Sequence, residues 1–139
     1  MNSYKLIGNG LLMSDIKTFE DLECWKKARR LRIKISELAK IFPNDEKFGL
    51  TSQIVRAIRS VSHNIAEGYG RFHFRKNTQF CRTSGGSLYE VLDQVIVANE
   101  EGYITENVLK EIRKDILENI KILNGYINYL VKCAENKNG

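Results

Sequence analysis

The stretch LTSQIVRAIRSVSHNIAEGYG at residues 50–70 has the pattern of one amphipathic helix. Its apolar residues recur at steps of three and four, which places them on one face of an α-helix. They are Leu50, Ile54, Ala57, Ile58, Val61 and Ile65, whereas Ser52, Arg56, Arg59 and His63 share a polar face. Gly68 and Gly70 are predicted to end the helix, because glycine is common at helix C-termini.

The preceding segment predicts another helix of the same kind. Thr18, with an acidic residue three positions later at Asp21, reads as its N-cap. Pro43 is predicted to end it. Its apolar stripe is Leu22, Trp25, Ala28, Leu31, Ile35, Leu38 and Phe42, and its opposite face carries Lys26, Lys27, Arg29, Arg30 and Lys34.

Two more helices follow residue 70. The first is expected to begin near Asn77 as N-cap and to end at Gly102, with the stripe Phe80, Ser84, Leu88, Val91, Leu92, Val95 and Ile96. The second is capped by Thr105 and carries the seam Leu109, Ile112, Ile116, Ile120, Leu123, Ile127 and Leu130. No segment shows the strict alternation of a half-buried strand.

Four amphipathic helices with short connections predict an all-α fold, an antiparallel up-down four-helix bundle. The bundle is expected over residues 18–135, with an N-terminal extension at 1–17 that is disordered or peripheral and a tail at 136–139. Ile33, Ile122 and Tyr129 lie outside the apolar faces of their predicted helices. They suggest a second buried surface formed by self-association, although scattered exposed apolar residues are also common.

Composition excludes several classes of protein. The 139 residues contain three widely spaced cysteines and no paired Cys/His spacing, so neither a zinc site nor a disulfide framework is expected, and a reducing cytoplasmic setting fits. No apolar run is long enough to span a membrane. We expect no metal, cofactor or small-molecule substrate, and His63 and His73 lack partners at a catalytic spacing, so we expect no enzyme.

Positive charge is concentrated in the middle of the chain. Residues 47–82 carry seven Lys or Arg and one Asp or Glu, a net charge of +6, whereas residues 1–46 carry +2 and residues 83–139 carry −3. A basic block of this kind favours an anionic partner such as RNA or DNA. The alternative is a solvated polar face, or arginines that form salt bridges between subunits.

The residues that would contact a nucleic acid follow from this block. Lysine and arginine neutralise phosphates, and aromatic side chains stack on unpaired bases. The candidate phosphate contacts are Lys26, Arg30, Arg56, Arg59, Arg71, Arg75, Lys76 and Arg82, and the candidate stacking residues are Tyr69, Phe72 and Phe74.

The segment NIAEG at 64–68 has a structural interpretation. Asn64 is expected to satisfy backbone groups, Glu67 to pair with a nearby arginine, and Gly68 to break the helix. Its glycines do not make a phosphate-binding loop, because no strand precedes them and no GK[ST] follows.

Several of these motifs together resemble a known family. FEDLECWKKARRL at 19–31, FPNDEKFGLTSQIVRAIRSVSHNIAEGYGR at 42–71, GSLYEVLDQ at 86–94 and EGYI at 101–104 are similar to the proteins encoded within intervening sequences of bacterial 23S ribosomal RNA genes. The resemblance covers about residues 19–131 and implies a left-handed antiparallel bundle that assembles into a homo-oligomeric ring, typically a pentamer. It also implies suspected binding of RNA or other nucleic acid. HFRKN at 73–77 departs from the family pattern, being more aromatic and basic than its usual linker.

Overall fold

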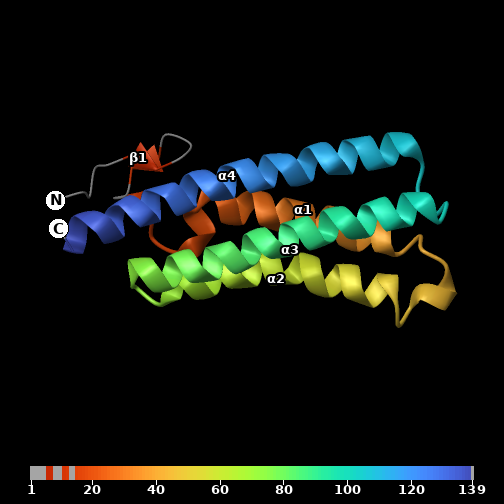
Figure 1. The fold of residues 1–139 in the computed structure, drawn as a ribbon, viewed down its shortest axis with the longest axis horizontal. Helices are drawn as coiled ribbons and strands as arrows, with labels where there is room; N and C mark the ends of the chain where they lie inside the picture. The colour runs from red at the N-terminus through yellow and green to blue at the C-terminus, as the bar shows by residue number, and fades with distance from the viewer. Residues whose placement is uncertain (1–5, 8–10, 13–14, 139) are drawn as a thin grey trace.

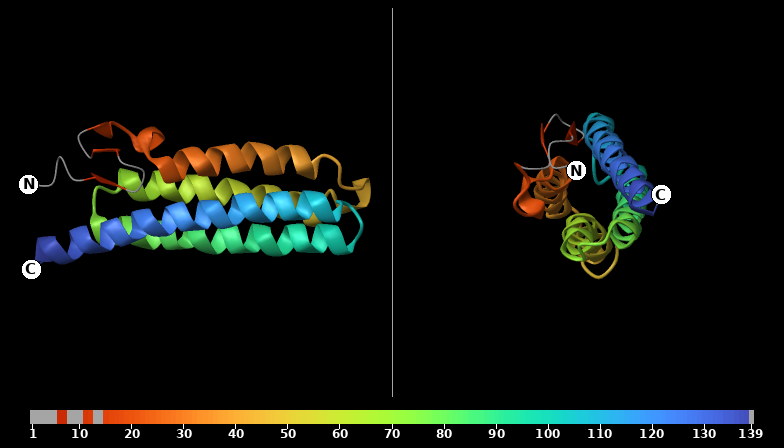
Figure 2. Two further views of the ribbon diagram at one scale, coloured as in Figure 1. Left: turned by 90° about the horizontal axis from the view of Figure 1, so that it is seen from above. Right: turned by 90° about the vertical axis from the view of Figure 1, so that its left-hand side faces the viewer.

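Four long helices run antiparallel in chain order around a common axis (Figures 1 and 2). The computed structural model describes residues 6–7, 11–12 and 15–138. The elements are β1 (Leu6–Ile7), β2 (Leu11–Leu12), η2 (Phe19–Asp21), α1 (Glu23–Ala39), η3 (Asn44–Glu46), α2 (Leu50–Gly70), α3 (Phe74–Glu100) and α4 (Glu106–Asn138). The predicted all-α up-down bundle is therefore confirmed.

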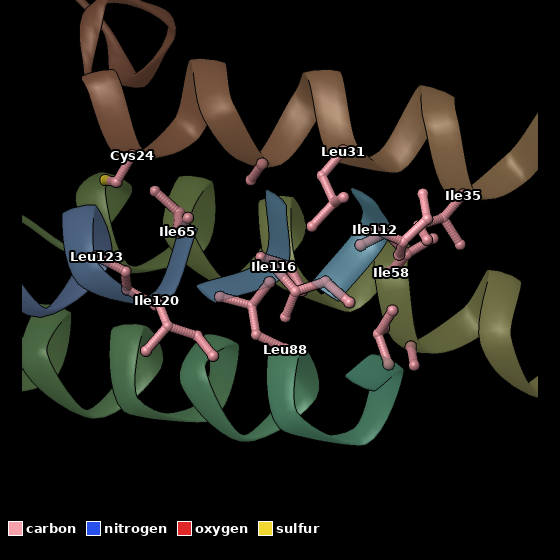
Figure 3. Close-up of a cluster of buried hydrophobic side chains, with 14 of the residues drawn as sticks. Cys24, Leu31, Ile35, Ile58, Ile65, Leu88, Ile112, Ile116, Ile120 and Leu123 are labelled. Carbon is pink, nitrogen blue, oxygen red and sulfur yellow. The ribbon is translucent and has the colours of Figure 1, made fainter. Parts of the chain in front are cut away.

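The interior is formed by the predicted apolar stripes. Side chains from all four helices meet along the axis, and those labelled in Figure 3 come from each of the helices in turn. The four stripes are confirmed in outline, with Trp25, Leu38, Leu92 and Leu109 only partly buried against the core. Phe80 and Ile96 of the α3 stripe are also only partly buried and do not belong to the core cluster. The buried residues that the patterns missed are Cys24, Ala39, Ser62, Asn77, Thr78, Cys81, Gln94, Ala98, Ile104, Asn119, Tyr126, Tyr129 and Cys133.

The start of α1 differs from the prediction. Thr18 and Asp21 do form a capping box, but it caps the short helix η2, and the backbone NH of Glu20 donates to Thr18 Oγ1 at 3.1 Å. Backbone hydrogen bonds from Lys17 and Thr18 hold the pKa of Asp21 below its ordinary value. Leu22 is extended, so α1 begins at Glu23 rather than at Thr18.

The connection between α2 and α3 also corrects the prediction. α2 continues through Gly68 to Gly70, so Gly68 does not break the helix. A Cβ atom at position 68 would lie 2.6 Å from Asn77 Oδ1 and 2.9 Å from Phe80 Cβ, so the glycine is what lets α3 approach α2. α3 begins at Phe74 with His73 as its N-cap, because His73 Nδ1 accepts from the backbone NH of Lys76 at 3.3 Å.

Asn77 therefore lies inside α3 and not at its N-cap. Its side chain is buried, and its Nδ2 donates to the Tyr126 hydroxyl of α4 at 3.1 Å. A polar side chain can occupy this interior position because its hydrogen-bonding groups are paired there.

Two of the three apolar residues that fell off their stripes are covered within the chain. Tyr129 is buried and stacks on Tyr126 with 6.3 Å between ring centroids, and Ile122 is partly buried against the core. Ile33 alone of the three is exposed. The apolar face of α4 is wider than a simple seam, so Ile122 and Tyr129 do not indicate a second surface.

One carboxylate joins the two connections at the far end of the bundle. Glu46, in the α1–α2 loop, accepts the hydroxyl of Tyr103 from the α3–α4 turn at 2.8 Å and the backbone NH of Leu50 at 3.1 Å. These bonds lower the pKa of Glu46, the Leu50 bond most, and the bond to Glu46 raises the pKa of Tyr103 to about 12. The start of α2 and both connections are thereby held together.

The N-terminal region holds a pair of two-residue strands that the sequence pattern did not predict. β1 and β2 pair antiparallel, with Leu6 opposite Leu12, and β1 lies beside α4 (Figure 1). The prediction that residues 1–17 are disordered or peripheral otherwise falls mainly outside the described residues. Among the described residues, no helix is both long and apolar enough to cross a membrane.

Candidate nucleic-acid interface

Lysines of α1 are engaged by acids of α4. Lys27 Nζ lies 2.9 Å from Glu118 Oε1, and Lys34 Nζ lies 2.6 Å from Asp115 Oδ2 and 3.1 Å from Glu111 Oε1. The hydrogen bond to Asp115 is the main cause that raises the pKa of Lys34. The groove between the helices, about 230 Å³, is lined by Lys27, Arg30, Leu31, Lys34, Asp115, Glu118 and Asn119.

One predicted phosphate contact, Arg30, lines the groove between α1 and α4, which we call the α1–α4 seam. It lies there among the carboxylates of α4. Lys26 lies elsewhere on α1, where its charge helps to lower the pKa of Asp21. Nearby acids repel a polyanion, so both residues are weaker candidates than their sequence context indicated.

The outer face of α2 is different, since its cations are free. Among the described residues, Arg56 and Arg59 have no ion pair and no side-chain hydrogen bond, and both are exposed. They line a shallow groove of about 710 Å³ that runs along this one helix, together with Thr51, Ser52, Val55, Ser60, His63, Asn64 and Glu67. We call these residues the α2 face.

The small side chains of the α2 face were not among the predicted site residues. Thr51 and Ser52 precede the two arginines along α2 and Ser60 follows them, and these short side chains line the groove together with the arginines. The sequence does contain a pattern that indicates them, because hydroxyl residues recur on the polar side of the predicted helix at 50–70.

Arg32 is a further cation beside this face that sequence reasoning missed. It is partly buried between α1 and α2, and its Nη1 donates to Ser62 Oγ at 2.7 Å. Ser62 Oγ in turn contacts the backbone carbonyl of Arg59 at 3.4 Å. Only the packing of α1 on α2 brings these groups together, since thirty residues separate Arg32 from Ser62.

The α2–α3 turn carries the next group of predicted contacts. Arg71 Nη2 lies 2.8 Å from Glu67 Oε2, and its guanidinium carbon lies 5.1 Å from the ring centre of Phe80. Arg75 and Lys76 are exposed, and their side chains have no charged partner in the described part of the chain. Two of the three cations of the turn are thus available to a ligand.

Arg82 is not joined to the α2 face. Ser87 marks the side of α3 that meets α2, because its Oγ lies 2.8 Å from Ser60 Oγ. Five residues separate Arg82 from Ser87, a rotation of about 140° around the helix. Arg82 instead shares an outward face with Arg75 and the exposed Tyr89, each two turns apart.

The three predicted stacking residues differ in exposure. Phe72 is 84% exposed, whereas Tyr69 and Phe74 are partly buried against the core. Phe72 also has a backbone φ of 53°, in the left-handed region. Only Phe72 presents an open aromatic surface.

The signature residues Asn64, Glu67 and Gly68 all make contacts within the chain. Asn64 Nδ2 donates to the carbonyl and the hydroxyl of Ser60, at 2.8 Å and 3.0 Å. Glu67 pairs with Arg71, and Gly68 lies against α3. These contacts shape the end of α2 and leave the nearby arginines on its surface.

Comparison with known proteins identifies the family. No curated protein matches the chain. The family model described as 23S rRNA-intervening sequence protein matches residues 20–125, which is well over half of the sequence and includes α1, α2, α3 and most of α4. The chain therefore belongs to the family of 23S rRNA-intervening sequence proteins.

Proposed function

We propose that this protein binds RNA electrostatically and without catalysis, through the α2 face and the α2–α3 turn. The observation that carries the proposal is the contrast in pairing: Arg56, Arg59, Arg75 and Lys76 have no charged partner among the described residues, whereas Lys27 and Lys34 of α1 are paired with acids of α4. Unpaired surface cations neutralise phosphates and release the counterions that surround a nucleic acid.

We further propose that the protein acts as a homo-oligomer in the cytoplasm, without a cofactor. The resemblance to ring-forming relatives supports the assembly, and a ring would repeat the basic surface and raise avidity without new contacts. The three cysteines are all free, which fits a reducing compartment.

The second candidate is a protein-interaction scaffold that binds no nucleic acid. The observation that favours it is the α2 groove, which the partly buried Val55 and several hydroxyl side chains line beside the arginines. A helix of another subunit fits such a surface, and the arginines would then face that subunit.

The test is RNA binding measured against salt concentration with three double variants. Arg56→Ala/Arg59→Ala removes charge from the α2 face, and Arg75→Ala/Lys76→Ala removes it from the turn. Lys110→Ala/Lys114→Ala is the matched control, since both lysines are exposed on α4 and the change in charge is the same. For a single strand, each neutralised phosphate contributes about −0.7 to the slope of log K against log salt. Each site variant removes two cations and is therefore expected to reduce the magnitude of this slope by about 1.4, whereas the control is expected to leave it unchanged.

Two outcomes decide between the candidates. If the wild-type protein does not bind RNA at low salt, or if the control loses as much affinity as the site variants, RNA binding through this surface is wrong. Light scattering gives the subunit count of the same samples. Dissociation of the Arg56→Ala/Arg59→Ala variant into monomers would place those arginines between subunits and favour the scaffold.

A further inference from the structure

We propose that Phe72 stacks on an unpaired base, so that the α2–α3 turn takes single-stranded rather than duplex RNA. This inference rests on the proposed RNA-binding function and names the class of RNA. It follows from the exposure of the Phe72 ring, its backbone conformation and the cations around it.

The ring of Phe72 is presented to solvent. The residue is 84% exposed at the tip of the α2–α3 turn, and Tyr69 supports it from the side of the bundle, with 6.1 Å between ring centroids and 58° between ring planes. Tyr69 itself packs against the core, so it provides a fixed support. One surface of the Phe72 ring is thus open to a flat ligand.

The backbone at Phe72 is in an unfavourable conformation. Its φ of 53° makes it the one non-glycine residue with positive φ in the described part of the chain. Bulky side chains rarely adopt this region, which favours glycine. Gly70 lies only two residues earlier, inside α2. Phe72 directly follows Arg71, the C-cap of α2, where a left-handed residue, usually glycine, commonly ends a helix. Here an aromatic residue occupies that position and its ring is exposed.

Phe48 provides an internal comparison. It is 89% exposed in the α1–α2 loop, at the opposite end of the bundle, and it follows a lysine as Phe72 follows an arginine. Lys47 Nζ lies 5.5 Å from the centre of its ring, so a cation already occupies that surface. Among the described residues no cation lies over Phe72, and the guanidinium of the preceding residue, Arg71, contacts Glu67 and the Phe80 ring.

The neighbouring charges suit a strand whose bases are unstacked. Arg75 and Lys76, three and four residues after Phe72 in the first turn of α3, are exposed and have no charged partner among the described residues. They can neutralise the phosphates on either side of a base that stacks on Phe72. In a duplex the bases are paired and stacked on one another, so their faces cannot reach the ring.

Fluorescence titration with two RNA probes tests the proposal. One probe is a single strand of about 12 nucleotides that contains 2-aminopurine, and the other is a duplex of the same length without overhangs. Phe72→Ala is expected to weaken binding of the single strand about 10-fold and to abolish quenching of 2-aminopurine, with duplex binding unchanged. Phe72→Trp is expected to keep both the affinity and the quenching, and Phe48→Ala to behave as wild type.

Phe72→Gly separates stacking from folding. Glycine fits the left-handed conformation, so this variant is expected to melt at a higher temperature than wild type while binding the single strand as weakly as Phe72→Ala. The stacking proposal is overturned if the Phe72 variants bind the single strand like wild type, if they lose duplex binding equally, or if Phe48→Ala loses as much. If wild-type protein binds neither probe at low salt, the proposed RNA-binding function itself fails.

Discussion

The α2–α3 seam and the α1–α4 seam hold the same bundle together by different means. α2 and α3 meet through small residues, since Gly68 lies against Asn77, and Ser84 Oγ donates to the Val61 carbonyl at 2.7 Å. Lys27 and Lys34 of α1 bridge to acids of α4, and a groove remains between these helices.

This difference between the two seams explains where unpaired positive charge is found on the surface. Across the α1–α4 seam Lys27 and Lys34 are paired with carboxylates, so these two lysines contribute to the packing of the helices and little to the free positive charge. The α2–α3 seam needs no charge, because its surfaces fit closely and its hydrogen bonds are internal. The cations next to it are therefore left on the surface.

Filling the close contact of the α2–α3 seam is expected to have the largest effect. Gly68→Val should lower the free energy of unfolding by about 3 kcal/mol, because its Cβ would overlap Asn77 and Phe80. Gly86→Val is the matched control, since nothing lies within 4 Å of a Cβ at that exposed position of α3. Urea denaturation measures both, and an equal loss at the two positions would show that helix propensity, not close approach, explains Gly68.

Removing the buried hydroxyl of the same seam should have an intermediate effect. Ser84→Ala deletes the donor to the Val61 carbonyl and is expected to lower the free energy of unfolding by about 1 kcal/mol. Thr83→Ala is the neighbouring control, because Thr83 is exposed and, within the described part of the chain, its hydroxyl donates only to the Gln79 carbonyl of its own helix. A loss for Thr83→Ala as large as that for Ser84→Ala would argue against the seam as the cause.

Neutralising the charged seam should have the smallest effect. Lys34→Met is expected to lower the free energy of unfolding by less than about 1 kcal/mol, because the lysine side chain is 40% exposed and solvent screens its pairs. Lys40→Met is the control, since its only ion pair within the described residues, with Glu37, is more exposed still. Thermal melts in low and high salt measure both variants, and a deficit for Lys34→Met that persists in high salt would contradict an electrostatic seam.

The ion pairs of Lys34 also predict how the stability of the α1–α4 seam changes with pH. Its hydrogen bond to Asp115 raises its pKa above the ordinary 10.5, so the folded state holds the proton more tightly than the unfolded state. The stabilisation is complete below that ordinary value and is lost as the pH rises through the raised pKa. The difference in stability between wild type and Lys34→Met should therefore be constant from about pH 6 to 9 and narrow above about pH 10.5. A difference that grows with pH in the alkaline range would exclude this ion pair as its source.

Sequence periodicity predicted the four helices and most of the core, because both depend on local spacing. It failed where a residue's role is set by another helix. The sequence pattern predicted that Gly68 ends α2, but Gly68 is the residue that α3 contacts. The pattern predicted that Asn77 is an N-cap, but its buried side chain donates a hydrogen bond to Tyr126. Glycine and asparagine serve either purpose, and only the packing of α3 decides between them.

For the candidate site, the sequence identified the cations but not which of them are free. Lys27 and Lys34 are paired by α4 residues more than seventy positions away, and Arg32 is drawn into the α1–α2 contact. Likewise, three aromatic residues were equivalent in the sequence, and the structure leaves only Phe72 exposed.

The carboxylate of Glu46 has a consequence for protein engineering. Because it binds both the start of α2 and Tyr103, the α1–α2 loop and the α3–α4 turn cannot be lengthened independently. An inserted tag or fluorescent domain in either connection would separate three partners at once. A new chain terminus made by circular permutation is better placed at the opposite end of the bundle, between α2 and α3, although it would there disturb the turn that carries Phe72.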